Sequence, residues 1–109
     1  MLRTLALAVL LMVAALPASA GFKEGVAAYK RGDYRTALRD WRPLAEQGHA
    51  KAQAWLGFMY LTGQGVTKNY REAIKWYRKA AEQGYAAAKY NLGLMYKNGA
   101  AFRRTPARP

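Results

Sequence analysis

Apolar residues recur at helical spacing through the middle of the chain and predict five helices within residues 21–99. The clearest stripe runs through Ala37, Leu38, Trp41, Leu44 and Ala45, which share one face of a helix of 3.6 residues per turn. The predicted helices span about 21–31, then 34–47 after a cap at Asp33, then 50–62, the segment from an Asn69 cap to Gly84, and finally 86–98. Glycines 48 and 84 suit helix ends because glycine adopts the left-handed conformation without steric cost.

Two segments of the chain are nearly the same. Residues 45–63 superimpose on residues 81–99 after a shift of 36, with 11 of 19 positions identical. A fixed period of this size indicates a stacked repeat, in which each unit needs a neighbour to cover its apolar face. The sequence therefore predicts an all-α fold, a short α-solenoid of antiparallel helix pairs with about five helices.

The first twenty residues have the three regions of an export signal. Arg3 gives a basic start, residues 5–16 are apolar, and Ala18-Ser19-Ala20 forms a small-residue cleavage site. Twelve apolar residues are too few to span a bilayer, which takes about 20. We expect residues 1–20 to be a signal peptide cut after Ala20, and the mature protein to be periplasmic or secreted and not membrane-spanning. An uncleaved anchor is the alternative.

Charge and cysteine content narrow the possible partners. The chain has no cysteine, so it forms no disulfide and offers no thiol. Residues 21–109 hold 17 basic and 6 acidic side chains, which favours anionic partners such as acidic proteins or phosphate-bearing envelope polymers. The basic residues are not arranged in a nucleic-acid motif, so we expect no nucleic acid. Alternatively, the lysines and arginines only solvate the helix surfaces.

The helical pattern stops at Gly99. Residues 100–109 have no apolar period and contain three arginines and two prolines, which predicts a basic disordered tail after a repeat domain over residues 21–99.

Two spaced motifs carry a family resemblance. They are Leu56-Gly57-x-x-Tyr60-x-x-Gly63-x-Gly65-Val66 and Ala73-x-x-Trp76-Tyr77-x-Lys79-Ala80-Ala81-Glu82-Gln83-Gly84. They closely resemble the Sel1-like repeat, a relative of the tetratricopeptide repeat. The resemblance covers about one and a half units, preceded by a tetratricopeptide-like half at Gly32-Asp33-Tyr34-x-x-Ala37-x-x-x-Trp41. It implies an α-solenoid whose leading helices line a concave, partner-facing surface, and a role in assembling proteins rather than in chemistry.

The departure from the repeat after Gly99 leaves the last helix without its expected partner. Neither Gly-Val nor Ala-x-x-Trp-Tyr follows, so nothing is predicted to cover Leu92, Met95 and Tyr96. An open apolar end predicts self-association or partner binding through this end. A truncated remnant of a longer array is the alternative.

The residues of the mature chain offer little for catalysis. His49 is the only histidine, and residues 21–109 contain no serine, so a general base would have no nucleophile or positioned partner. The acidic residues lack metal-ligand spacing. Gly63-x-Gly65 follows no strand and indicates an interhelical loop rather than a phosphate site. We expect no enzyme activity, cofactor or metal.

Helical periodicity gives candidates for partner binding. If Leu56 and Gly57 face the partner helix of their unit, the opposite side carries positions 51, 54, 58 and 61 and, one repeat later, 87, 90, 94 and 97. The candidates are Lys51, Phe58, Leu61, Tyr90, Leu94 and Lys97, with Ala54 and Ala87 between them. They suggest an aromatic and aliphatic groove edged by lysines, suited to a helix or extended peptide with acidic groups. Alternatively, Phe58 and Leu94 belong to the core.

The sequence as a whole predicts an exported, non-catalytic protein–protein interaction module. The alternative function is binding of an anionic glycan of the cell envelope, to which the basic field and exposed aromatic residues are suited.

Overall fold

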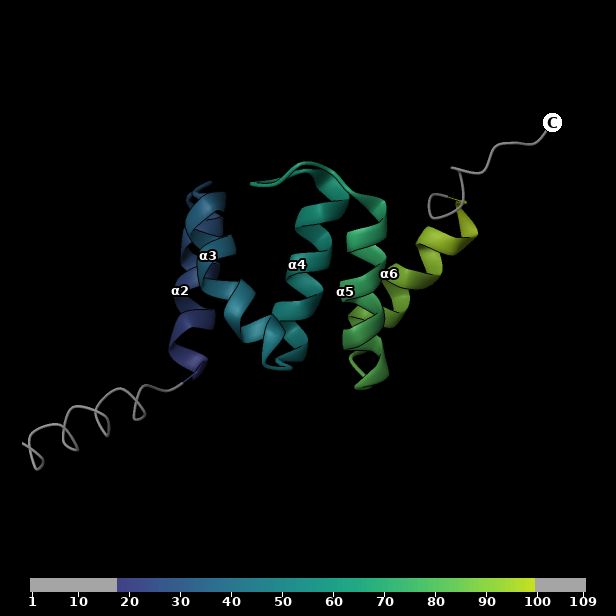
Figure 1. The fold of residues 1–109 in the computed structure, drawn as a ribbon, viewed down its shortest axis with the longest axis horizontal. Coiled ribbons are helices and arrows are strands. Elements are labelled where there is room, and N and C mark those ends of the chain that lie inside the picture. Colours follow the sequence, from purple (N-terminus) through teal and green to yellow (C-terminus); the bar gives the residue numbers. More distant parts are fainter. Residues whose placement is uncertain (1–17, 100–109) are drawn as a thin grey trace, which may run out of the picture.

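The computed structural model describes residues 18–99, and side chains from residue 21 onward. It contains five helices in this range: α2 Ala18–Lys30, α3 Tyr34–Glu46, α4 Ala50–Thr62, α5 Tyr70–Glu82 and α6 Ala86–Lys97 (Figure 1). The predicted all-α fold is confirmed, and α3 to α6 match their predicted bounds to within a residue or two. The first helix begins three residues before its predicted start at Gly21. Most of the predicted signal peptide and the whole predicted tail lie outside the described residues.

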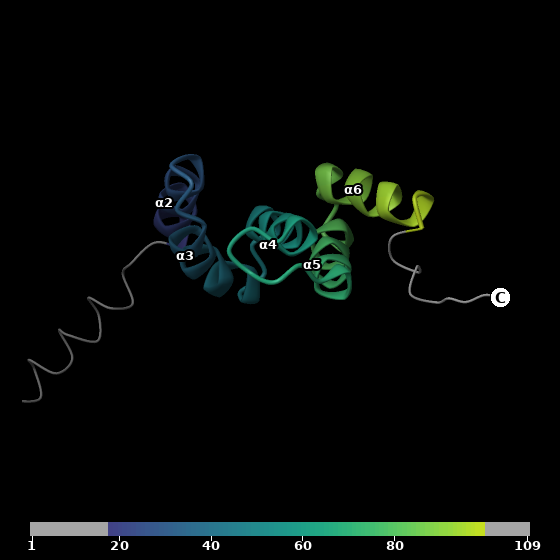
Figure 2. The same cartoon turned by 90° about the horizontal axis from the view of Figure 1, so that it is seen from above.

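Successive helices run in alternating directions, and each packs mainly against its neighbours in sequence (Figure 1). The view from above places α2, α4 and α6 toward one side of the stack and α3 and α5 toward the other (Figure 2). The middle helix α4 is set back between α2 and α6, so these three leading helices enclose a concave side. This arrangement is a short solenoid of stacked helix pairs.

Side-chain caps begin three of the helices. Asp33 accepts a hydrogen bond from the Thr36 amide at 3.3 Å, and Asn69 accepts one from the Glu72 amide at 3.1 Å, as the sequence predicted. His49 begins α4 in the same way, because its Nδ1 accepts from the Ala52 amide at 3.1 Å. Tyr85, one repeat later, makes no cap hydrogen bond. The single histidine therefore has a structural role at a helix start.

Two apolar clusters hold the stack together, and α4 contributes to both. The first surrounds Trp41, Leu56 and Met59, all fully buried, and joins α2, α3 and α4, with Trp76 of α5 at its edge. The second surrounds Tyr77, Ala73 and Ala80 and joins α4, α5 and α6. Since each cluster is made by more than one helix pair, each pair covers apolar surface of the next.

A glycine in α4 permits the close approach of α5. A Cβ added at Gly57 would lie 3.1 Å from the ring of Tyr77 and 3.2 Å from the Ala73 carbonyl oxygen. Any larger side chain would push the two helices apart.

The end of the stack is more covered than the sequence suggested. Met95 is only 4% exposed because it packs into the second cluster against α5, so the expectation that nothing covers it is wrong. Leu92 is half-buried in the same cluster. Tyr96 is 37% exposed, and its hydroxyl accepts a hydrogen bond from Arg78 just as the Tyr60 hydroxyl accepts one from Arg42.

Candidate binding surface

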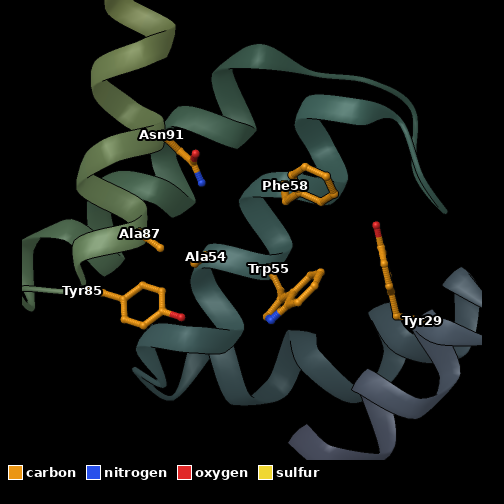
Figure 3. Close-up of a pocket in the computed structure, with 7 residues that line it drawn as sticks. All are labelled: Tyr29, Ala54, Trp55, Phe58, Tyr85, Ala87 and Asn91. Carbon is orange, nitrogen blue, oxygen red and sulfur yellow. The ribbon is translucent and has the colours of Figure 1, made fainter.

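A hollow of about 370 Å³ lies on the concave side, between the three leading helices (Figure 3). Its lining comes from α2, from the middle of α4, and from the start of α6 with the residue before it. The lining residues are Tyr29, Ala54, Trp55, Phe58, Tyr85, Ala87 and Asn91. Four of the seven are aromatic and none carries a formal charge at neutral pH, so the hollow is suited to an apolar group.

The ring of Trp55 forms the floor of the hollow and packs against three other aromatic rings. Trp55 stacks on the fully buried Trp41, with centroids 5.0 Å apart and an interplanar angle of 28°. Its ring also lies 4.9 Å from Tyr29 and meets Phe58 edge to face at 6.2 Å. Contacts of this kind fix the orientation of each ring, so the aromatic surface is formed before any partner arrives.

The loop between α4 and α5 holds one wall in place. The Tyr29 hydroxyl donates a hydrogen bond of 2.8 Å to Gln64 Oε1, which also accepts from the Thr62 hydroxyl. Gly65 has φ +77° and packs so tightly on Tyr34 that an added Cβ would lie 3.0 Å from the Tyr34 Cβ. The glycine pair therefore serves as an interhelical loop, as the sequence indicated, and it positions Tyr29.

The opposite wall is formed by Tyr85, Ala87 and Asn91, whose amide points into the hollow (Figure 3). Behind this wall lies Tyr77, and burial raises the pKa of its phenol to about 12, while the Asn91 amide opposes part of that shift. The Tyr77 hydroxyl has no well-aligned hydrogen-bond partner among residues 18–99. Because its pKa is raised by burial, the Tyr77 phenol is protonated at neutral pH and adds no charge to the site.

The structure spreads the six candidate partner-binding residues over four places. Phe58 lines the hollow, together with Ala54 and Ala87 from the same spacing argument. Leu61 is half-buried on the second cluster. Lys51 is exposed, with its Nζ 6.0 Å from the centroid of the Phe22 ring. The other three are exposed on α6: Tyr90, Leu94 and Lys97.

This spread has a simple geometric cause. The spacing argument treated one side of α4 as free, but α5 packs against part of that side and buries Ala54 to 8% exposure. The equivalent positions of α6 have no such helix beside them within the described residues.

Sequence reasoning missed four of the lining residues: Tyr29, Trp55, Tyr85 and Asn91. Two of them carried a usable signal, because Trp55 and Asn91 stand 36 residues apart and so occupy the same place in the repeat. The contribution of Tyr29 depends on how α2 stacks against α4, which periodicity within one helix does not give.

The described part of the chain offers little for metal binding or membrane crossing. Among residues 18–99, no three His, Cys, Asp or Glu side chains are grouped closely enough to hold a metal ion. None of the helices in this range is long and apolar enough to cross a bilayer.

The chain was compared with protein-family models and with curated proteins. The family model described as Sel1 repeat matches residues 50–85 and 86–104. No protein in a search of curated proteins matches the chain.

Solved structures with the same fold include a Sel1 repeat protein from Oxalobacter formigenes, which is 40% identical with a TM-score of 0.67. That match covers 72% of this chain and 32% of the other. A second is c5321, described as a protective antigen of uropathogenic Escherichia coli strains with an SLR fold, at 38% identity and a TM-score of 0.69. It covers 76% of this chain and 19% of the other, so the chain spans a third or less of each relative.

Proteins of this family typically act as protein–protein interaction modules, and the fold is generally a scaffold rather than a catalyst. The two matched repeats, the helix pairs and the solenoid of the solved relatives agree: the chain belongs to the Sel1 repeat family.

Proposed function

We propose that this protein is an exported, non-catalytic interaction module that binds a segment of another protein on its concave side. The observation that carries the proposal is the preformed aromatic hollow between α2, α4 and α6, in which Trp55 is held by stacking on the buried Trp41. A hollow of this size is suited to one or two apolar side chains of a bound segment rather than to a whole folded domain.

The charge of the chain favours an acidic segment. The chain carries a net charge of +12, and Lys51 stands exposed on α4, the helix that carries Trp55 and Phe58. A segment with an aromatic or aliphatic anchor and flanking carboxylates would fill the hollow and be attracted by the surrounding field. The Asn91 amide has one donor group and one acceptor oxygen, so it can bind a peptide backbone beside the anchor.

Export is part of the proposal because of the first twenty residues. The basic start, the apolar stretch over residues 5–16 and the Ala18-Ser19-Ala20 site support passage out of the cytoplasm. Fractionation of cells, with the N-terminal residue of the mature protein read by mass spectrometry, tests it. A chain that starts at Gly21 in the periplasm or medium is expected, and full-length protein in the cytoplasm would contradict it.

Peptide selection followed by calorimetry tests the binding proposal. Peptides with an apolar anchor and acidic flanks are selected on the purified protein, and their affinities are then measured for Phe58→Ala, Asn91→Ala and Tyr90→Ala. We expect the first two substitutions to weaken binding at least tenfold, because both residues line the hollow. Tyr90 is 67% exposed and outside the lining, so its substitution is the matched control.

Two results would contradict the proposal. One is an affinity that depends on Tyr90 and not on Phe58 or Asn91. The other is a loss of helical circular dichroism in Phe58→Ala, since that would assign Phe58 to the core alone.

An anionic glycan of the cell envelope is the second candidate partner, and the net charge of +12 favours it. Binding of that kind would fall steeply as salt rises and would ignore Phe58→Ala. Retention on an acidic polysaccharide column, measured against salt for the wild-type protein and Phe58→Ala, separates the two candidates.

A further inference from the structure

One face of α6 differs in exposure from the matching face of α4. In α4, the matching face packs on α5 and consists of buried or half-buried residues: Ala50, Gln53, Ala54, Gly57 and Leu61. In α6, the five equivalent residues are all exposed: Ala86, Lys89, Tyr90, Gly93 and Lys97. Figure 1 shows α5 on one side of α6 and no further described helix on the other. We call these five residues the outer face.

Gly93 lies at the centre of the outer face, and no contact among the described residues requires a glycine there. Its counterpart Gly57 is needed because the ring of Tyr77 lies 3.1 Å from where a Cβ would stand, whereas a Cβ at Gly93 would meet no described atom within 4 Å. A glycine inside a helix costs about 1 kcal/mol relative to alanine. The open notch at Gly93 is therefore suited to the close approach of a second helix, as at Gly57.

The outer face also carries charge that the α4 face lacks. Gln53 and Leu61 of α4 are replaced in α6 by Lys89 and Lys97. The two lysines stand four residues to either side of Gly93, so they lie on the same side of the helix. Since α6 contains no acidic residue, a helix laid against this face meets two lysines that no carboxylate of α6 offsets.

The packing of α5 on α4 gives the register of such a helix. There, Gln83 Nε2 donates to Gln53 Oε1 at 2.9 Å and also to the Gly48 carbonyl oxygen. A helix seated on α6 in the same way would place its residue at the Gln83 position beside Lys89. A carboxylate at that position would pair with the lysine, whereas a second lysine would repel it.

We infer that the outer face of α6 docks an amphipathic helix of another protein. This helix has the small and aromatic stripe of α5, formed there by Ala73, Tyr77 and Ala80, and it carries a carboxylate at the position of Gln83. It binds through the notch at Gly93 and the ion pair at Lys89. This surface is separate from the concave hollow, so the inference does not depend on the proposed function.

A second copy of the chain fits this face less well. Two α6 helices packed antiparallel about Gly93 would bring Lys89 of each onto Lys97 of the other, and a parallel pair would align each lysine with itself. Either arrangement sets like charges against each other without a carboxylate on α6 to offset them.

A charge swap between the chain and a peptide tests the inference. Three labelled peptides cover residues 69–84 of this sequence, one with the natural Gln83, one with Gln83→Glu and one with Gln83→Lys, and fluorescence anisotropy reports their binding to the full chain. We expect the Glu peptide to bind at least tenfold more tightly than the Lys peptide. The variant Lys89→Glu should reverse that order, and Lys51→Glu, with the same change in net charge, should not.

Steric variants give an independent reading. Gly93→Gln should weaken binding of the Glu peptide at least tenfold without loss of helical circular dichroism, because a Cβ there meets no atom of residues 18–99 within 4 Å. Ala87→Gln, which alters the concave hollow on the same helix, should leave this peptide unaffected.

Three results would overturn the inference. The first is a reversal by Lys51→Glu equal to that by Lys89→Glu, which would mean general attraction only. The second is an unchanged affinity in Gly93→Gln. The third is a stable dimer in sedimentation that Gly93→Gln dissociates, which would assign the face to a second copy.

Discussion

Helices α4 and α6 occupy the same place in successive repeats, yet their surroundings differ. Leu56 of α4 is fully buried, while its counterpart Leu92 is half-buried; Met59 and Met95 are both buried. The difference follows the neighbours, since α4 packs on α3 and α5, whereas α6 packs mainly on α5 among the described helices. Position in the stack, more than local sequence, decides how much of each helix is covered.

The contrast separates two groups of residues in the repeat: those that pack on the preceding helix and those that a following helix would cover. Residues that face the preceding helix stay buried in both units: Ala52 and Met59 in α4, Ala88 and Met95 in α6. Residues that face the following helix are covered in α4 and open in α6. Because apolar area removed from water is the main stabilising term, equal substitutions in the two helices should have unequal costs.

Truncation of the paired leucines should show the largest difference. Leu56→Ala is expected to cost about 2–5 kcal/mol, because it leaves a cavity in a fully buried site, whereas Leu92→Ala should cost about 1 kcal/mol. Urea unfolding followed by circular dichroism measures both. Equal costs would mean that α6 is covered as fully as α4.

Enlarging the paired glycines should give effects of opposite sign. Gly57→Gln is expected to destabilise by about 1–3 kcal/mol, because the new side chain overlaps the Tyr77 ring and the Ala73 carbonyl. Gly93→Gln should stabilise by about 0.5 kcal/mol, because glutamine is the better helix former and its Cβ would contact none of the described residues. Thermal melts of both variants measure this, and a destabilised Gly93→Gln would contradict the open face.

Tyr77, whose ring packs on Gly57 of α4, links stability to alkaline pH. Its folded pKa of about 12 lies above the value near 10 expected in the unfolded chain. Its contribution to stability is therefore complete below about pH 10 and is lost as the pH rises toward 12, by up to about 1.4 kcal/mol per pH unit. Tyr77→Phe should reduce this slope and cost little at neutral pH, because the buried hydroxyl lacks a well-aligned partner.

Unfolding of Tyr77→Phe and the wild type across this range tests the prediction. Lysine deprotonation affects both proteins alike, so the difference between their slopes isolates the phenol. Parallel curves would be the contradicting result.

The His49 cap of α4, which has no counterpart at Tyr85 of α6, should contribute about 1 kcal/mol or less to the free energy of unfolding. His49→Ala removes the acceptor for the Ala52 amide and is expected to cost about 1 kcal/mol. His49→Asn keeps an acceptor and should recover most of that loss, although the ring stacked 5.0 Å from Phe22 is gone. Urea midpoints rank the variants, and a histidine that mattered only through stacking would give the same loss in both.

Much of this fold was accessible from the sequence because its interactions repeat. Features that depend on local or recurring interactions could be read from the sequence. They are the period of 36 residues, the caps at Asp33 and Asn69, and the glycine at position 57. The hollow was only partly predicted. Phe58 follows from helical periodicity, whereas Tyr29 and Tyr85 enter it through the angle between successive helix pairs, which is a property of the stack.

The expectation that Met95 would be uncovered was the clearest error of the sequence analysis. Absence of a following helix was taken to uncover Met95 along with Leu92, but Met95 faces back toward α5 and needs no further partner. A helix at the end of a solenoid therefore loses cover on one side only. The exposed side, centred on Gly93, is where sequence comparison with α4 becomes most useful.

Native-state hydrogen exchange is the most direct test of the account that stacked helices cover one another. Amide protection should be greatest in α4, which is covered on two sides, and lowest among the four helices α3 to α6 in α6, which is covered on one. Protection of α6 equal to or greater than that of α4 in the free protein would contradict it.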